Sequence, residues 1–364
     1  ITYYRKYLLL QESESLTKPL SEFLENLDTN KVLDIINNMK KQNIKWLTQT
    51  PRKIDSINFI IPSFGKDSSA GPRQIIQLAR FLKLKGSDIY FSVFSNNGKS
   101  VQDFVDVIKN DEILKYSKVL QIESIEDLDS LPHFNIAIAT YWATAYPLLF
   151  MSDVDAKFYF IQDEEGIFYP ASLDRYFAEF TYTLGYIGIT NDATLQNFYS
   201  NYMPCFRIPL SFIRGKRKNI NELGGVRKIF AYYRYAPRNS PELIYNLSRK
   251  LVSELPDVTL YLAGGGVFED NERIVSLGWL STKDLIKLYN ESDLCLYFMF
   301  NLHSGIIPLE CMNIGDVVVT NDKQIRHPYI MNGYNGMIVL PTLNSIVNAV
   351  KAIASNSELR IKLV

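Results

Sequence analysis

Short apolar runs alternate with segments of helical periodicity along most of the chain. In the first half the runs are rich in β-branched and aromatic residues and cover 57–62, 89–95, 118–122, 135–140, 157–162, 186–190 and 206–210. Continuous apolar strands separated by helices are typical of a parallel sheet that is covered on both faces. The pattern therefore predicts a doubly wound, Rossmann-like α/β domain over residues 55–210.

The same alternation begins again after residue 225. The later apolar runs cover 228–233, 259–265, 274–278, 293–298, 316–320 and 336–340, with helical periodicity between them. They predict a second Rossmann-like domain over residues 226–364. Residues 211–225 are polar and basic without apolar periodicity, and are expected to form an interdomain linker. Residues 1–54 are mostly polar helix pattern, typical of an appended helical arm.

Composition narrows the function classes. The 364 residues hold 39 Lys and Arg against 39 Asp and Glu, so no overall positive charge favours nucleic-acid binding, and any anion site must be local. The three cysteines form no C-x-x-C pair and the three histidines have no metal-ligand spacing, which indicates a reducing compartment and no metal site.

The most apolar stretch, 134–151, contains Asn135 and Pro147. It is expected to form a buried strand and helix rather than a transmembrane span. The chain starts at Ile1 and stops at Val364 inside a helical pattern, which is compatible with a fragment of a longer protein.

Ligands of open α/β sheets bind beyond the carboxyl ends of the strands, so the loops after the apolar runs are the places to search. In the second domain a Ser304–Gly305 turn follows run 293–298 and opens a helix. The unpaired N–H groups and positive dipole end of such a helix suit phosphate oxygens. Glu310, about one turn further in, could accept hydrogen bonds from two vicinal sugar hydroxyls. Alternatively, Ser304 caps the helix and Glu310 is solvated.

Two arginines, Arg234 and Arg238, follow the first run of the second domain. Guanidinium groups at this spacing suit a diphosphate, although a surface turn with solvated charges would look the same. The glycine turn 263–266 and the segment 278–280 follow the next two runs and could receive a nucleobase, or simply make turns. The expected donor-binding residues are Gly65, Gly71, Gly265, Gly278, Trp279, Leu280, His303, Ser304, Gly305, Ile306, Ile307 and Glu310.

In the first domain, the polar loop 65–71 is flanked by glycines, which would allow its backbone to approach a donor diphosphate. Arg73 lies just inside the following helix. Tyr141 and Trp142 follow run 135–140 and could form the floor of an acceptor site, where a sugar would stack on their rings. Alternatively, Trp142 is a buried residue of the hydrophobic core. Arg73, Tyr141, Trp142 and Gln162 are the expected acceptor-binding residues.

Three consecutive carboxylates, Asp163, Glu164 and Glu165, come directly after run 157–162. Such a group is costly at a strand end unless it is solvated or used. Asp163 and Glu164 are expected to act near an acceptor hydroxyl, and Arg234 and Arg238 to stabilise a leaving diphosphate. No residue stands out as a nucleophile for a double displacement.

The order of these segments resembles a known family. The series YxRxxxRN, AGGG, LGWLS and HSGxxPLE, each after a predicted strand, is similar to the nucleotide-sugar-binding lobe of retaining, family-4 GT-B glycosyltransferases. Segments 61–86, 139–146 and 159–170 are similar to the bacterial rhamnosyltransferase branch typified by WsaF. The resemblance covers about residues 55–355.

This resemblance implies two Rossmann-like domains facing each other across a cleft. It implies metal-independent, retaining transfer of a sugar from a nucleotide diphosphate sugar to a hydroxyl of a bacterial glycan, with a diphosphate that helps to take the acceptor proton. Deoxythymidine-diphosphate (dTDP) rhamnose is the favoured donor, with UDP-glucose, UDP-galactose and GDP-mannose as alternatives. The resemblance also implies that the protein is cytoplasmic. If its acceptor is linked to a lipid, the protein is expected to act at the inner face of the cell membrane.

One position departs from the family. The wider family has two glutamates eight residues apart. Glu310 matches the second, but Leu302 stands at the position of the first, so the identity of the donor sugar stays open. A non-catalytic glycan- or nucleotide-sugar-binding protein and a nucleotide-sugar 2-epimerase stay as alternatives. The basic run 214–218 is interpreted as a solvated linker, with contact to anionic lipid headgroups as the other interpretation.

Overall fold

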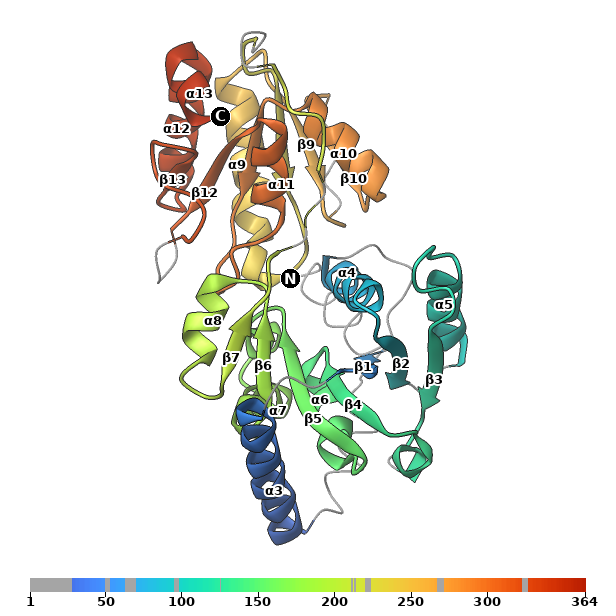
Figure 1. The fold of residues 1–364 in the computed structure, drawn as a ribbon. Coiled ribbons are helices and arrows are strands. Elements are labelled where there is room, and N and C mark those ends of the chain that lie inside the picture. The colour runs from blue at the N-terminus through green and yellow to red at the C-terminus, as the bar shows by residue number, and fades with distance from the viewer. Residues whose placement is uncertain are drawn as a thin grey trace. The chain divides into compact units, whose positions relative to one another are not determined.

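The structure is a computed structural model that describes residues 28–49, 53–62, 70–94, 98–124, 126–210, 212, 214–219, 224–266, 272–322 and 327–364. The chain divides into two compact units, Ile1–Pro209 and Leu210–Val364 (Figure 1). Each is described by itself. No described helix is both long enough and apolar enough to span a bilayer.

The first unit is built on a seven-stranded parallel sheet of order β3-β2-β1-β4-β5-β6-β7. Its strands are β1 (Ser56–Pro62), β2 (Asp88–Phe94), β3 (Lys118–Ile122), β4 (Phe134–Ala139), β5 (Val154–Ile161), β6 (Ile187–Thr190) and β7 (Cys205–Arg207). Its helices are α3 (Thr29–Thr48), α4 (Ala70–Leu84), α5 (Gly98–Lys109), α6 (Trp142–Phe150), α7 (Leu173–Phe180) and α8 (Ala193–Tyr199), with short 3₁₀ turns η1 (Glu126–Ser130), η2 (Glu165–Phe168) and η3 (Thr181–Thr183).

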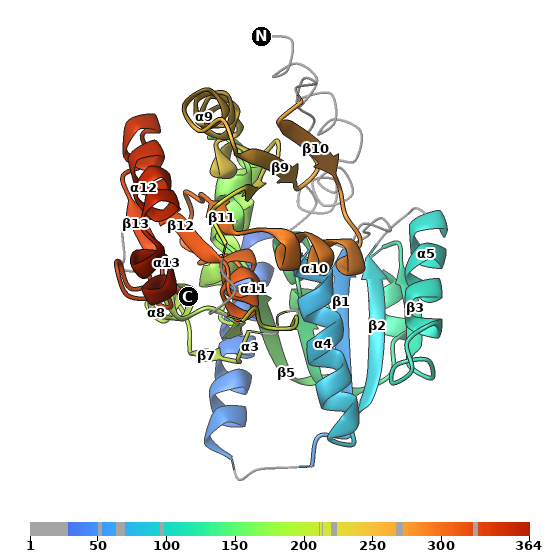
Figure 2. The same ribbon diagram turned by 90° about the horizontal axis from the view of Figure 1, so that it is seen from above.

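Alternating strand residues form the core of this unit. Phe59, Phe91 and Phe158 are buried together with Ile75 from α4 and Phe104 from α5. Helix α4 lies against β2 (Figure 2). The apolar stretch 134–151 forms β4 and the buried helix α6, as predicted.

A buried amide on helix α3, that of Asn43, helps to dock the helix on the first unit. The Asn43 side chain donates to the carbonyl oxygens of Lys157 (3.2 Å) and Gly185 (3.0 Å), and accepts from the Lys157 N–H (3.0 Å). Because Asn43 is almost fully buried, these bonds fix the helix to β5. The described part of the expected arm is thus packed on the unit.

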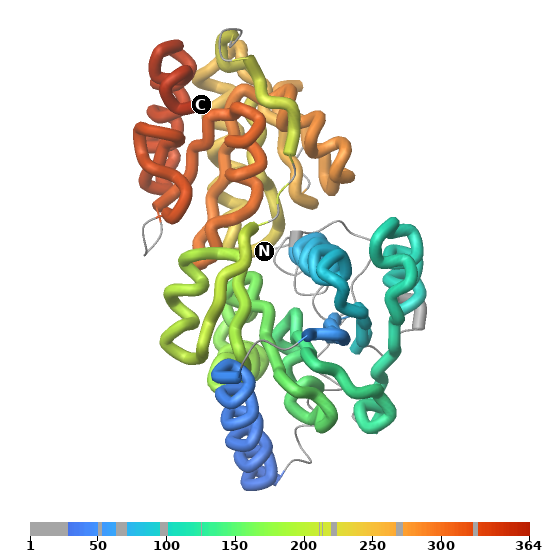
Figure 3. The backbone as a smooth tube through the Cα atoms, in the orientation of Figure 1, coloured from blue at the N-terminus to red at the C-terminus, as the bar shows by residue number. Residues whose placement is uncertain are grey.

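The second unit has a six-stranded parallel sheet of order β10-β9-β8-β11-β12-β13. Its strands are β8 (Lys228–Tyr232), β9 (Thr259–Ala263), β10 (Ile274–Gly278), β11 (Leu294–Tyr297), β12 (Val317–Asn321) and β13 (Met337–Val339). Its helices are α9 (Pro241–Glu254), α10 (Thr282–Glu291), α11 (Ile307–Ile314), α12 (Leu343–Ser355) and α13 (Ser357–Leu363), with the 3₁₀ turn η5 (Pro237–Asn239). Figure 3 shows the chain path within each unit.

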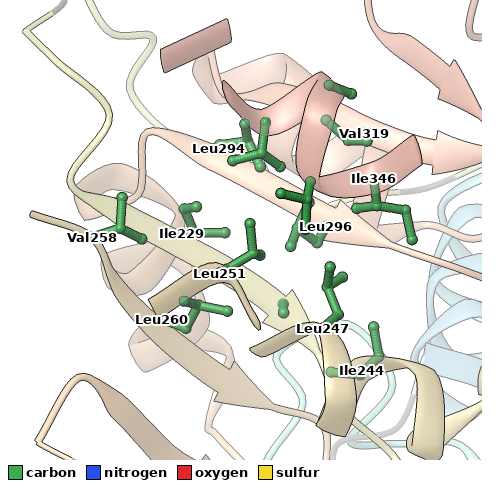
Figure 4. Close-up of a cluster of buried hydrophobic side chains, with 14 of the residues drawn as sticks. Ile229, Ile244, Leu247, Leu251, Val258, Leu260, Leu294, Leu296, Val319 and Ile346 are labelled. Carbon is green, nitrogen blue, oxygen red and sulfur yellow. The ribbon is translucent and has the colours of Figure 1, made fainter. Parts of the chain in front are cut away.

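Apolar side chains cover both faces of this sheet. On one face Ile229 and Leu296 pack with Leu247 of α9 and Ile346 of α12 (Figure 4). On the other, a cluster that includes Phe230 packs under α10 and α11. Both units are therefore doubly wound, as predicted. In each, the strand order reverses between the first and fourth strands, where ligands of such sheets bind.

Part of the expected linker is docked on the second unit. The Lys218 N–H donates to the Ile314 carbonyl (2.8 Å), and its ammonium group pairs with the buried Asp316 carboxylate and donates to the Ser292 carbonyl. The prediction of a solvated basic run is wrong for Lys218, because its side chain is only 17% exposed. Arg217 in turn donates to the Val364 carbonyl (3.1 Å).

Candidate functional site

Three loops of the second unit meet beyond the carboxyl ends of β8, β9 and β10. The Arg234 guanidinium, after β8, lies over the Trp279 ring at 5.4 Å from its centroid. The same indole lies against Gly265, after β9, so closely that a Cβ there would come within 2.4 Å of it. Trp279 is 49% exposed and Arg234 is half-buried, so both side chains reach solvent beside this turn. The structure thus brings together two residues predicted for donor binding, Gly265 and Trp279, and one predicted to stabilise the leaving diphosphate, Arg234.

Backbone geometry explains the glycines of this loop. Gly264 and Gly265 have φ of +131° and +92°, the left-handed region that L side chains rarely adopt. The Gly264 N–H donates to the Gly278 carbonyl (3.0 Å) and the Gly266 N–H to the Tyr233 carbonyl (3.0 Å). These bonds join the three loops at the backbone level. Gly278 has φ of +61° with no described atom within 4 Å of a Cβ position.

Arg238 lies on η5 and connects the loop after β8 to the loop after β11. Its carbonyl accepts from the Phe300 N–H at 2.9 Å. Arg234 therefore lies with Trp279, while Arg238 lies beside the segment that leads to α11. Their convergence on one diphosphate stays a prediction.

The segment before α11 contains residues of the predicted anion site. The Gly305 N–H, expected to bind phosphate, donates to His303 Nδ1 at 2.9 Å, and its role toward phosphate stays a prediction. Ser304 does not cap the helix, because the capping position is Ile306, directly before Ile307. Gly305 has φ of +79°, and a Cβ there would meet the Tyr297 hydroxyl at 2.4 Å.

Asn321 supports the same segment and was not identified from the sequence. Its side-chain oxygen accepts from the Met299 N–H (3.0 Å) and its amide donates to the Met299 carbonyl (3.0 Å). The residue is buried at the end of β12, so it holds the chain where it leaves β11. A single asparagine at a strand end carries no sequence signal for this role.

Glu310 is buried rather than solvated. Only 1% of the residue is exposed, and Oε2 accepts from the Tyr289 hydroxyl at 3.2 Å. Leu302, where the wider family has its other glutamate, is buried at 8% exposure. Leu280 packs on the core beneath α10 and α11. A role for Glu310 toward sugar hydroxyls stays a prediction.

In the first unit, the first turn of α4 and the loop after β5 come together. A Cβ at Gly71, in the first turn of α4, would lie 3.7 Å from Gln162 Oε1. That oxygen is buried and has no hydrogen-bond partner within the described part of the chain. Gly65 lies outside the described residues, and Arg73 is half-buried on α4.

The loops after β4 and β5 are joined by aromatic side chains. Trp142 is fully buried, so the prediction that it floors an acceptor site is wrong and the core alternative holds. Its Nε1–H donates to the Tyr169 hydroxyl (3.1 Å), which lies 2.6 Å from the Tyr141 hydroxyl. Tyr141 and Tyr169 are half-buried and remain accessible at this edge.

The three consecutive acids have different environments. Asp163 and Glu164 are half-exposed, and Asp163 Oδ1 accepts the Glu164 N–H at 2.8 Å. Glu165 is buried, and its Oε2 accepts from the Trp142 N–H (2.6 Å) and the Tyr159 hydroxyl (2.7 Å). Burial raises the pKa of the Glu165 carboxyl to about 8, although both hydrogen bonds lower it. No group of three His, Cys, Asp or Glu side chains within the described ranges could hold a metal ion.

Comparisons with known proteins agree on the architecture. Solved structures similar to this chain include HepE of Anabaena with UDP-glucose (TM-score 0.65, 13% identity, covering 85% of this chain and 92% of that one) and TarM of S. aureus (TM-score 0.67, 9% identity, covering 86% and 95%). The chain has the GT-B fold. This confirms the predicted fold class.

Sequence comparison points in the same direction. Residues 227–353 match the family model described as the WsaF C-terminal domain. The chain is 30% identical over 247 residues to the O-antigen biosynthesis protein RfbC of Myxococcus xanthus, a match that covers 65% of this chain. It spans only 19% of that relative's length.

Proposed function

We propose that this protein is a glycosyltransferase that moves a sugar from a nucleotide diphosphate donor to a hydroxyl of a glycan acceptor. The observation that carries the proposal is the cluster of Arg234, Trp279 and Gly265 at the carboxyl edge of β8–β10. A guanidinium next to an exposed indole and a bare glycine turn offers charge for a diphosphate, an aromatic face and a close approach to backbone. The GT-B fold, the match to the WsaF C-terminal domain and the similarity to RfbC support it.

The leaving diphosphate is the chemical demand on this site. Arg234 and Arg238 would stabilise its growing negative charge, and preorganised donors of this kind are typically worth about 3–4 kcal/mol each. Within the proposal no metal is required, and the transfer retains the anomeric configuration by front-side attack. The favoured donor is dTDP-rhamnose and the acceptor a bacterial surface glycan, lipid-linked at the inner face of the cytoplasmic membrane.

A non-catalytic sugar-nucleotide-binding protein is the second candidate. Leu302 favours it, because a buried leucine stands where the wider family has a glutamate. Nucleotide release separates the candidates: a transferase releases nucleotide faster with acceptor, a 2-epimerase converts donor sugar without acceptor, and a binder does neither.

The donor site is tested by calorimetric titration of the protein with UDP, dTDP and GDP. Hydrogen bonds to charged groups are worth about 1.5–3 kcal/mol, so Arg234→Ala should weaken nucleotide binding roughly 10- to 100-fold. Arg249→Ala is the matched control, because Arg249 also lies over an aromatic ring, 5.8 Å from the Tyr245 centroid, but on α9. Equal affinities for the wild-type protein and both variants would refute the assigned site.

A further inference from the structure

Glu165 forms hydrogen bonds between two loops that are separate in the sequence. It is the first residue of η2, in the loop after β5, and is only 3% exposed. Its Oε2 accepts from the first N–H of α6, that of Trp142, in the loop after the neighbouring strand β4. Tyr159, near the end of β5, donates to the same oxygen. One oxygen of the Glu165 carboxyl group therefore joins two adjacent loops at the carboxyl edge of the sheet.

These two loops carry the side chains expected to meet an acceptor. Tyr141 immediately precedes Trp142, and Gln162, Asp163 and Glu164 immediately precede Glu165. All four are half-buried and reach solvent, whereas Glu165 contacts protein groups from inside. The Tyr141–Tyr169 hydroxyl contact at 2.6 Å closes a second connection between the same two loops.

The connection is not the ordinary way to begin a helix. A Ser, Thr, Asp or Asn side chain at the capping position accepts from the second or third N–H of a helix, so the first N–H of α6, that of Trp142, needs another acceptor. The N–H is instead satisfied by a carboxyl group from 23 residues further along the chain. Burying this carboxyl is costly, as its pKa, raised to about 8, indicates. The Thr144 hydroxyl already accepts the Tyr141 N–H at the start of α6 (3.1 Å), so the Glu165 bond adds a connection between the two loops that local capping does not supply.

We propose that Glu165 is a positioning residue for the acceptor, which holds Asp163 and Glu164 in a fixed place relative to Tyr141. Glu165 does not touch substrate and takes no proton in the transfer. The inference rests on the proposed function, since it assigns this edge of the first unit to the acceptor of that reaction. It concerns acceptor use, because the cluster of Arg234, Trp279 and Gly265 proposed to bind the nucleotide lies in the second unit.

The test compares Glu165→Ala, Glu165→Gln and Tyr159→Phe, with Asp111→Asn as the matched control. Asp111 is also a buried carboxylate that accepts two backbone N–H groups, at 3.0 Å each, but it precedes β3 and so lies at the amino edge of the sheet. The probes are dTDP-rhamnose and UDP-glucose as donors and a panel of p-nitrophenyl glycosides as acceptors. The measured quantities are the donor dissociation constant, nucleotide release in water alone, and kcat/KM for the acceptor probe.

Glu165→Ala should lower kcat/KM for the acceptor at least tenfold, while the donor dissociation constant and release in water change less than twofold. Tyr159→Phe removes one of the hydroxyl groups that bond Glu165 and should lower kcat/KM for the acceptor about threefold. This variant tests the inference even if Glu165→Ala does not fold. Glu165→Gln should restore most of the loss, because its amide oxygen accepts the same two bonds. Asp111→Asn should change none of the three quantities.

Equal losses in donor and acceptor parameters, an unrescued Glu165→Gln, or the same acceptor loss in Asp111→Asn would overturn the inference. A wild-type protein that binds donor nucleotide but gives no acceptor-dependent release with any glycoside would also overturn it and leave the donor site standing. A wild-type protein that binds no nucleotide would instead refute the proposed function.

Discussion

Replacing Gly265 with alanine should disrupt the contact on which the donor cluster depends. Gly265 has φ of +92°, and a Cβ there would lie 2.4 Å from the Trp279 indole. Two effects therefore combine, backbone strain and a steric overlap with the ring that lies under Arg234. Trp279 must move away from the loop for alanine to fit.

The size of each effect can be worked out separately. Left-handed backbone costs an L residue roughly 1–2 kcal/mol. Forcing an extra methyl group into a filled site costs about 1–3 kcal/mol more. This range includes the loss of the Arg234–Trp279 contact, which is worth roughly 0.5–1 kcal/mol. Gly265→Ala should lower the free energy of unfolding by about 2–5 kcal/mol in total.

Gly333→Ala provides the matched control. Gly333 has φ of +72°, with no described atom within 4 Å of a Cβ position, so alanine there has the strain alone. It should lose about 1–2 kcal/mol in urea unfolding followed by circular dichroism. Nucleotide affinity, measured by titration calorimetry, should fall more than tenfold in Gly265→Ala and stay unchanged in Gly333→Ala. Equal unfolding energies and equal affinities in the two variants would refute the reasoning.

Three further predictions concern charged groups and the exposed indole. The pKa of Glu165 is about 8 in the folded protein and 4.5 ordinarily, so its contribution to the free energy of unfolding is complete below pH 4.5 and is lost as pH rises through 8. The loss is at most about 1.4 kcal/mol per pH unit. In Glu165→Gln, the midpoint of urea unfolding should therefore change less between pH 5 and pH 8 than in the wild-type protein. Lys218→Met should lower the free energy of unfolding by about 3–5 kcal/mol in thermal unfolding, because it leaves the buried Asp316 without its partner. The double variant with Asp316→Asn should recover most of this loss. Losses that simply add in the double variant would contradict the prediction. Trp279→Ala should weaken nucleotide binding and Trp279→Phe should retain most of it, as measured by calorimetry.

The sequence predicted the fold because its signals are local. Apolar runs such as 57–62 and 316–320 identify buried parallel strands, and β1 and β12 occupy those places. The residues after strands could be selected in the same way, since strand order alone brings their loops to one edge. Arg234, Gly265 and Trp279 were found by this reasoning, and the structure places them in contact.

Side-chain direction could not be predicted. Asp163, Glu164 and Glu165 are chemically alike in the sequence, and only the fold shows that Glu165 turns inward. Trp142 and Trp279 both follow a strand, yet one is fully buried and the other half-exposed. Such differences depend on partners far away in sequence, such as Tyr169 for Trp142 and Arg234 for Trp279.

The pairing of Lys218 with Asp316 decides how the carboxy-terminal half can be produced as an autonomous protein. An expression boundary at residue 226, where the strand pattern restarts, would delete the ammonium group and leave a carboxylate stranded in the hydrophobic interior. Starting upstream of Arg214 keeps the ion pair and the contact of Gly215 with Ile314. Truncated versions that begin at 226 should aggregate, whereas those that begin before 214 should yield folded material for studying nucleotide recognition alone.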